Sequence, residues 1–286
     1  MRITISHQIQ YRYSRPVFLE PHILRLRPRT DATQQLLSFH LAISPQPAGR
    51  AENNDHGGAV STFAWFEGAT DHLTVRADSV TNTLRANPFE FILASERFAA
   101  LPMKYDTAER TALETYVAPE PAGAVTEYAG KILRECGGGT LDFISRLNMA
   151  IFENIHRIQR AEGAAWEAER TLTRGEGSCR DLTMLFIGCC RAAGLAARFV
   201  SGYAAGAPEE TEKELHAWAE VYLPGGGWRG FDPARGVACS LDHVAICSSA
   251  GPDSAAAVTG AIRGDGALAS MDYSVHIREE PAGANS

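Results

Sequence analysis

The sequence predicts an α+β protein in two parts, an all-β domain followed by a domain of helices and an antiparallel sheet. Apolar and polar residues alternate along most of "ITISHQIQYRY" (residues 3–13), which is the period of a half-buried strand. Apolar residues recur at helical spacing over residues 140–158, and three short strand-like segments follow the last expected helix. We therefore divide the chain into residues 1–95 and residues 96–286.

Short strand-like runs without an intervening helix fill the first domain. Clusters of Pro, Gly and Asn, such as "SPQPAGRAENNDHGG", separate these runs. After the first strand they are "HILRLRPR", "LLSFHLAIS", "VSTFAWF" and "HLTVRADSVTNTL". Such a series is typical of a β-sandwich or an open barrel.

The second domain begins with a proline-containing connector at residues 90–120. Helices are expected at about 122–135 and 140–158, separated by the break "CGGG", and a third helix begins near Ser178. Strands are then expected in "ARFVSGY", "HAWAEVYL", "GWRGFDP" and, near the C-terminus, "SMDYSVHIRE".

Composition limits the function classes. The chain has 286 residues and a formal net charge of −7, which argues against nucleic acid or an acidic membrane surface as a partner. Its N-terminal stretch lacks the apolar core of a signal peptide, and no apolar run approaches the ~18 residues that span a bilayer. We expect a cytoplasmic protein whose six cysteines are reduced thiols. The absence of CxxC and His-x₃₋₅-His pairs argues against a structural zinc site.

Cys179 stands at the start of the third expected helix, in "GEGSCRDLTMLFIGCC". Ser178 is a good N-cap residue, and Asp181 resembles the acidic half of a capping box. The unpaired amides and the dipole at this end favour an anion, and therefore thiolate over thiol. The same amides can donate to an oxyanion beside the sulfur. Cys189 and Cys190 lie further along the apolar stripe and are expected to be packing residues.

A nucleophilic thiol needs a general base, and the base needs an orienting group. His216 opens the strand "HAWAEVYL", and "PGGG" predicts a hairpin turn after it. The next strand ends at Asp232, so the hairpin can bring this carboxylate alongside His216 and fix the imidazole tautomer. Trp218 shares a strand face with His216 and could shape the wall of a substrate cleft. Taken singly, each residue also has an ordinary structural explanation.

The stretches around these residues resemble the bacterial transglutaminase-like superfamily. "GSCRDLTMLFIGCCRAAGLAARFVSGY" is similar to its nucleophile helix and the following strand, and "LHAWAEVYLPGGGWRGFDPARG" to its His and Asp strands. "LDHVAI" and "VTGAIRGDG" resemble its C-terminal segments, and the β-rich first hundred residues resemble the domain that often precedes this core in bacteria. The resemblance implies a papain-like core with a Cys-His-Asp triad formed by Cys179, His216 and Asp232. In relatives a Gly-Arg-Asp-Tyr segment usually follows "LDHVAI"; here the loop is "CSSAGPDSAAA", which we expect to border the substrate cleft.

The resemblance and the three residues together imply a thiol-dependent hydrolase of amide or peptide bonds, as in a cysteine protease. Its peptide or protein substrate would pass through a thioester acyl-enzyme, and no metal or organic cofactor is implied. Transfer of the same acyl group to an amine, as in transglutamination, is an alternative that the triad alone does not separate from hydrolysis. A binding module that retains the fold without catalysis is the third hypothesis. The substrate, the second oxyanion donor, the role of the β domain and the oligomeric state are left open.

Overall fold

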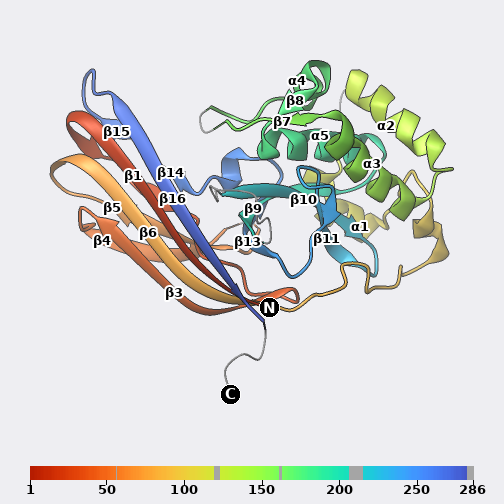
Figure 1. The fold of residues 1–286 in the computed structure, drawn as a ribbon, viewed down its shortest axis with the longest axis horizontal. Helices are drawn as coiled ribbons and strands as arrows, with labels where there is room; N and C mark the ends of the chain where they lie inside the picture. Colours follow the sequence, from red (N-terminus) through yellow and green to blue (C-terminus); the bar gives the residue numbers. More distant parts are fainter. Residues whose placement is uncertain (56, 119–122, 161–162, 206–214, 282–286) are drawn as a thin grey trace.

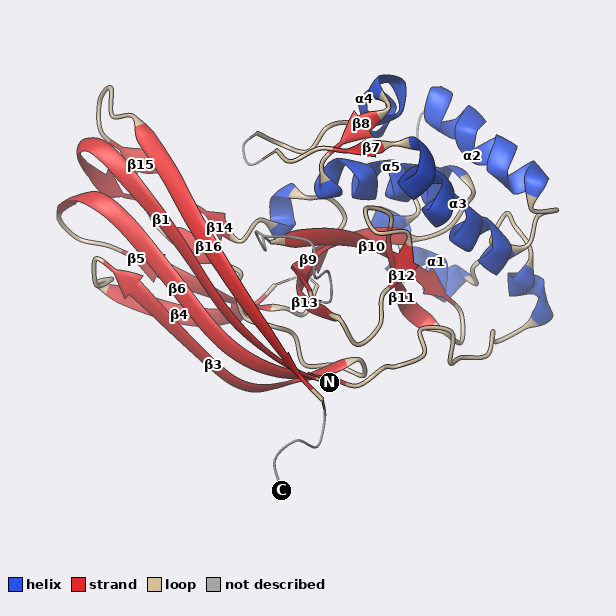
Figure 2. Ribbon diagram, in the orientation of Figure 1, coloured by secondary structure: helices blue, strands red, loops and turns tan. Residues whose placement is uncertain are grey.

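The computed structural model describes residues 1–55, 57–118, 123–160, 163–205 and 215–281. It confirms the α+β fold, with long antiparallel strands on one side and a smaller sheet covered by helices on the other (Figure 1). Figure 2 shows the same division by secondary structure. Residues 119–122, at the junction of the expected connector and the next expected helix, lie outside the described residues.

Two antiparallel sheets form the β-rich part. One has the order β15-β1-β6-β3, with β16 also pairing β1; the other has the order β14-β2-β5-β4. The strands of the first sheet are β15 (Ile262–Arg263), β1 (Arg2–Leu19), β6 (Ala69–Thr83), β3 (Gln34–Ser44) and β16 (Ala269–Glu280). Those of the second are β14 (Val258–Thr259), β2 (His22–Leu24), β5 (Val60–Trp65) and β4 (Gly49–Asn54). Apolar residues of β1, β2 and β6 share one core, as in a sandwich; they include Ile9, Val17, Leu24, Leu73 and Val75.

The C-terminal strands differ from the sequence-based division of the chain. The sequence-based division assigns all residues after 95 to the second domain, whereas β16 pairs with β1 along its whole length, from Arg2 opposite Glu280 to Tyr13 opposite Ala269. β14 and β15 likewise pair with β2 and β1. The blue strand beside the red one in Figure 1 is this pairing. The alternation of apolar and polar residues in a strand does not indicate a pairing partner so distant in the chain. The sequence therefore predicted the C-terminal strand correctly but assigned it to the wrong part of the fold. The boundary near residue 95 stays a prediction.

A third sheet, of order β12-β11-β10-β9-β13, carries the helices. Its strands are β12 (Val237–Ala238), β11 (Gly227–Asp232), β10 (His216–Leu223), β9 (Ala197–Ala204) and β13 (His243–Ser249). The helices are α1 (Thr107–Ala112), α2 (Ala124–Glu135), α3 (Thr140–Asn154), α4 (Ala168–Arg174) and α5 (Cys179–Ala192), with short 3₁₀ turns η1 (Glu96–Ala99), η2 (Glu114–Tyr116) and η3 (Asp253–Ala255). None of the described helices combines the length and apolar character needed to cross a bilayer.

Helix α5 is the centre of the larger core. Its apolar stripe recurs every three or four residues and is fully buried at Leu185, Phe186 and Cys189, against α2, α4 and β10. Phe186 stacks on Phe231 of β11, with ring centroids 6.0 Å apart. Burying each such side chain stabilises the fold by about 2 kcal/mol. This packing fixes the N-terminus of α5 over the starting edge of β10.

Helix α3 ends at Asn154, four residues before the expected end. Its C-cap residue Ile155 is extended, and the chain continues as β7 (His156–Arg157), which pairs in parallel with β8 (Glu176–Gly177). Strand pairing thus replaces the last predicted helical turn. It also brings the segment after α3 alongside the residues that lead into α5.

A buried ion cluster joins the β-rich part to the sheet that carries the helices. Glu220 of β10 accepts hydrogen bonds from Arg29 at 2.7 Å and from Arg198 at 2.7 Å, and all three side chains are nearly buried. Burial acts to raise the pKa of Glu220, but the two guanidinium groups outweigh it and lower the pKa to about 2. Ile3 and Ile5 of β1 also enter the core around α5. The β-rich part is therefore packed against the sheet that carries His216.

Candidate active site

The thiol of Cys179 lies at the first position of α5, as predicted. Ser178 is the N-cap residue, and its backbone amide and hydroxyl both donate to Oδ2 of Asp181, at 2.8 and 2.7 Å. The acidic partner expected from the sequence is therefore in place. The first amides of a helix have no intrahelical acceptor and favour an anion at this end of the helix.

Asp181 also holds the segment around residue 160 at one side of the site. Its Oδ1 accepts from the Arg160 guanidinium and from the Trp166 amide, each at 2.7 Å. Burial acts to raise the pKa of Asp181, but the donors from Trp166, Ser178 and Arg160 outweigh it and hold the pKa below its usual range. Arg180 donates in turn to the backbone carbonyl of Arg160, at 2.9 Å. One buried carboxylate thus ties the segment around residue 160 to the turn that presents the thiol.

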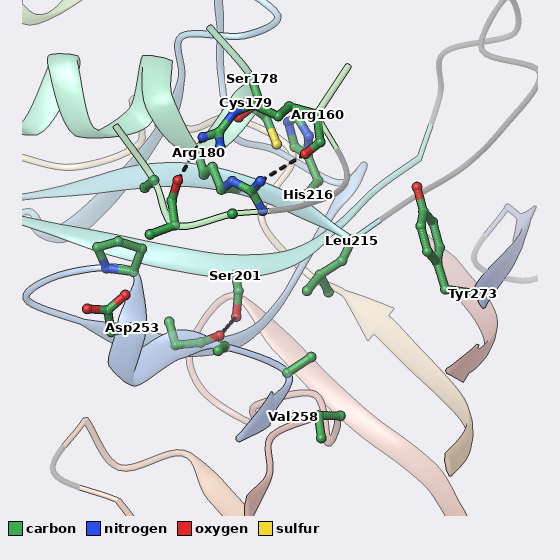
Figure 3. A pocket seen from close by; sticks show the side chains of 18 of the residues that line it. Arg160, Ser178, Cys179, Arg180, Ser201, Leu215, His216, Asp253, Val258 and Tyr273 are labelled. Atoms are coloured by element: carbon green, nitrogen blue, oxygen red, sulfur yellow. Dashed lines mark hydrogen bonds between the residues drawn. The ribbon is translucent and has the colours of Figure 1, made fainter. Parts of the chain in front are cut away.

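His216 begins β10, where it is 5% exposed, and it lines the same cavity as Cys179. Figure 3 shows the sulfur and the imidazole at the same cavity. On the next residues of β10 the alternation holds as expected, because Ala217, Ala219 and Val221 join the core around α5.

Asp232 is the last residue of β11 and is hydrogen-bonded to His216. Its Oδ2 lies 2.7 Å from Nε2 of His216, and its Oδ1 accepts from the Ala234 amide at 3.0 Å. Nε2 is thereby occupied, so Nδ1 is the imidazole nitrogen left for the sulfur. Burial acts to lower the pKa of His216, but the charge and hydrogen bond of Asp232, with Cys179, outweigh it and raise the pKa to about 10. The imidazole is therefore a cation at neutral pH, and a cation beside the sulfur stabilises thiolate.

Sequence reasoning missed a second histidine on the same carboxylate. Nε2 of His243, the first residue of β13, lies 3.2 Å from Oδ2 of Asp232. Its Nδ1 lies 2.8 Å from Oδ1 of the neighbouring Asp242. His243 stands in "LDHVAI", a segment that the family resemblance singled out without giving its histidine a role. An Asp-His pair at the start of a strand was the signal available.

Trp218 does not lie where the sequence suggested. Its side chain is 2% exposed and meets the His243 ring nearly edge-on, with centroids 5.2 Å apart. The indole lies over Gly202 of β9, where a Cβ would come within 2.4 Å of it. Trp218 is therefore a packing residue behind the histidines and not part of the cleft wall. Cys189 and Cys190 are fully buried, as expected.

A cavity of about 350 Å³ opens at Cys179 and His216, a size suited to a small ligand or a few side chains of a peptide. The β-rich part supplies one wall through residues of β1 and β16, namely His7, Ile9, Tyr11, Met271 and Tyr273. These strands pair so that Tyr11 lies opposite Met271 and Ile9 opposite Tyr273. Figure 3 shows Tyr273 and Leu215 at the cavity with His216. The N-terminal part thus contributes to the site directly.

Two further observations define the cavity. Residues 252, 253 and 255–258 line it, so the loop that follows β13 borders the cleft as expected. His7 bonds Tyr203 through Nδ1 at 2.9 Å, and burial lowers the pKa of His7 to about 4, so this part of the wall is uncharged. Within the described ranges, no group of three or more His, Cys, Asp or Glu side chains is arranged to hold a metal ion.

Comparison with known proteins agrees with this architecture. Aligned on a crystal structure described as a candidate cysteine protease from Cytophaga hutchinsonii, the chain gives a TM-score of 0.71 at 21% identity, over 98% of this chain and 91% of the other, which shows a shared fold. An uncharacterised protein of Mycobacterium tuberculosis is 28% identical over 251 residues, which are 82% of this chain and 79% of the relative. One from Mycobacterium leprae is 22% identical over 253 residues, covering 86% and 87%.

Two family descriptions match along the chain. Residues 3–82 match the bacterial transglutaminase-like N-terminal region, and residues 126–233 match the transglutaminase-like superfamily. The second range contains Cys179, His216 and Asp232. With its β-rich part and its helix-covered sheet in this order, the chain belongs to the transglutaminase-like superfamily and carries the N-terminal region found in bacterial members.

Proposed function

We propose that this protein is a thiol-dependent hydrolase of amide or peptide bonds in which Cys179 is the nucleophile, His216 the general acid and base, and Asp232 the orienting group. The observation that supports the proposal is the cavity that Cys179 and His216 share, with Asp232 hydrogen-bonded to His216 at 2.7 Å. Residues placed for catalysis in this order need no further group to form an acyl-enzyme. The fold shared with the candidate protease from Cytophaga hutchinsonii agrees with it.

The proposed reaction has two halves. The thiolate attacks the substrate carbonyl carbon, and the oxyanion accepts hydrogen bonds from the Cys179 backbone amide and its neighbours at the helix start. His216 gives its proton to the leaving amine as the carbon–nitrogen bond breaks, which leaves a thioester and a neutral imidazole. The imidazole then takes a proton from water, whose oxygen bonds to the carbonyl carbon while the carbon–sulfur bond breaks. The products are an amine and a carboxylic acid, and the thiolate–imidazolium pair is restored.

The composition of the cavity supports a substrate with a large apolar side chain near the scissile bond. The wall from β1 and β16 offers Tyr11, Met271 and Tyr273, and Tyr273 is 37% exposed. On the opposite side, the charge of Arg160 is already paired with Asp181. A peptide is thus proposed to lie between the two parts of the chain. The cytoplasmic location expected from the sequence stays a prediction.

Labelling with iodoacetamide at about pH 6 tests the nucleophile. Burial raises the pKa of Cys136, raises that of Cys239 to about 11 and that of Cys247 to about 12, so these thiols should stay unmodified in the native protein. We expect stoichiometric carbamidomethylation of Cys179, detected by peptide mass spectrometry. Labelling that begins only near pH 8.5, the ordinary value for a free thiol, would instead indicate a binding module.

Turnover is tested with a mixed peptide pool analysed by mass spectrometry. Cys179→Ala should abolish cleavage and leave the far-ultraviolet circular dichroism unchanged, whereas Cys136→Ala, at a thiol of similar partial exposure, should keep it. Full activity in Cys179→Ala would refute the mechanism. The same incubation with a glutamine donor and a labelled primary amine distinguishes hydrolysis from acyl transfer, because transfer attaches the label to the donor.

A further inference from the structure

His243 carries two hydrogen bonds that fix its protonation state. Its Nε2 faces Oδ2 of Asp232 at 3.2 Å, and its Nδ1 faces Oδ1 of Asp242 at 2.8 Å. A carboxylate oxygen accepts and does not donate, so both ring nitrogens must donate. An imidazole that donates from both nitrogens is the cation.

The groups that face His243 from the surrounding elements agree with this state. Asp232 comes from β11 and Asp242 from the turn before β13, and Arg235 lies 3.2 Å from the other oxygen of Asp242. The Cys239 thiol also acts on the pKa of His243, and Trp218 of β10 presents its ring to it. His243 is only 6% exposed, so water does not replace these partners. Burial acts to lower the pKa of His243, but Cys239, Asp232 and Asp242 outweigh it and raise the pKa well above its ordinary value.

Asp232 therefore lies between two imidazoles. His216 is 2.7 Å and His243 is 3.2 Å from the same oxygen, so the two Nε2 atoms are within about 6 Å of each other. A carboxylate that shares its charge with a second cation holds the first one less strongly.

We propose that His243 is a positioning residue for Cys179 and His216: as a permanent cation it takes up part of the charge of Asp232 and thereby allows His216 to release its proton. The proposal rests on the hydrolase mechanism above and adds a residue to it. His216 must be neutral to accept a proton from water in the second half of the reaction. Without the cation at residue 243, the whole charge of Asp232 would fall on His216 and keep it protonated.

The direct test measures the titration of His216 without any chemistry. In a Cys179→Ala background the thiolate no longer stabilises the imidazolium, and the ring nitrogens of His216 are followed by NMR after ¹⁵N-histidine labelling. Adding His243→Gln, which can still donate to Asp232 but carries no charge, should move the midpoint up by about one to two pH units. His72→Gln, at an exposed histidine paired with Asp71, is the matched control and should leave it unmoved.

A midpoint that stays in place or falls in folded His243→Gln protein would overturn the proposal, as would ring nitrogens of His243 with the shifts of a neutral imidazole. Should His243→Gln not fold, Asp242→Asn is the second variant, at a side chain that is 26% exposed. It keeps an oxygen that accepts from His243 but removes the negative charge that shares this cation with Asp232, so it should lower the midpoint of His216. A merely structural role would lower thermal stability and leave the titration unchanged.

The kinetic consequence is a split between the two half-reactions. With p-nitrophenyl acetate as the probe, acetylation of Cys179 should still give a burst of one p-nitrophenol per protein in His243→Gln. Deacetylation at about pH 7 should slow about 10- to 100-fold, following the smaller neutral fraction of His216. Equal loss of burst and deacetylation would refute the split. Failure of the wild-type protein to release p-nitrophenol in a Cys179-dependent reaction would refute the hydrolase itself, and the NMR result would still decide the role of His243.

Discussion

Replacing Glu220 with glutamine tests how strongly the β-rich part is held against the sheet that carries His216. The pKa of Glu220 falls from 4.5 to about 2 in the folded protein. That difference corresponds to about 3 kcal/mol of folding free energy at neutral pH. Removing one partner of a buried ion pair costs about 3 to 5 kcal/mol by general experience, because it leaves the charges of Arg29 and Arg198 buried without their counter-ion. Both routes give the same magnitude.

The assay is urea denaturation of the wild type and Glu220→Gln, with the free energy of unfolding extrapolated to water. The folded-state pKa is depressed, so the stabilisation is complete above pH 4.5 and is lost as the pH falls through 2. We therefore expect a difference of about 3 kcal/mol at pH 7 that shrinks to about 2 kcal/mol near pH 3.5. The control Glu52→Gln, at a 53% exposed partner of Arg27, should change stability by less than about 1 kcal/mol. A loss at pH 7 no larger than that of the control, or one independent of pH, would refute the reasoning.

Two further substitutions test other parts of the site. Asp181→Asn removes the charge that Arg160 pairs with at 2.7 Å, and it should lower the free energy of unfolding by about 2 to 4 kcal/mol. The control Asp106→Asn, at a 62% exposed carboxylate, should lower it by less than about 1 kcal/mol. Equal effects in the two variants would show that Asp181 is no anchor. Tyr273→Ala should slow inactivation of Cys179 by a phenylalanyl chloromethyl ketone about tenfold while leaving iodoacetamide labelling unchanged; a similar loss with an alanyl chloromethyl ketone would contradict an apolar subsite.

The sequence placed Cys179 correctly at a helix start because the signals for that start are local. Ser178, Cys179 and Asp181 lie within one helical turn, and an N-cap residue with an acidic partner at the third helical position specifies a helix start by itself. His216 and Asp232 belong to neighbouring strands of a short hairpin, whose alternation and turn fix their register. These are contacts between residues close in the chain, or on elements with a single simple pairing.

Other features were beyond the reach of local patterns. Trp218 shares a strand face with His216, but only the packing of β9 and β13 shows that this face meets Gly202 and His243 and not the cleft. The alternation of β16 was visible, yet its pairing with β1 joins residues some 270 positions apart. Likewise, α3 ends before its predicted C-terminus because the following residues form β7, which pairs with β8.

The amino-acid sequence by itself determined the two-part fold, the helix that presents Cys179, and the hairpin that carries His216 and Asp232. Only the tertiary structure decided that β1 and β16 form a wall of the cavity, that Glu220 joins the two parts, and that His243 shares the carboxylate of Asp232. The physical reason is that periodicity and capping are set by neighbours along the chain. Burial, ion pairing and the sharing of one oxygen by two imidazoles depend instead on which distant surfaces pack together.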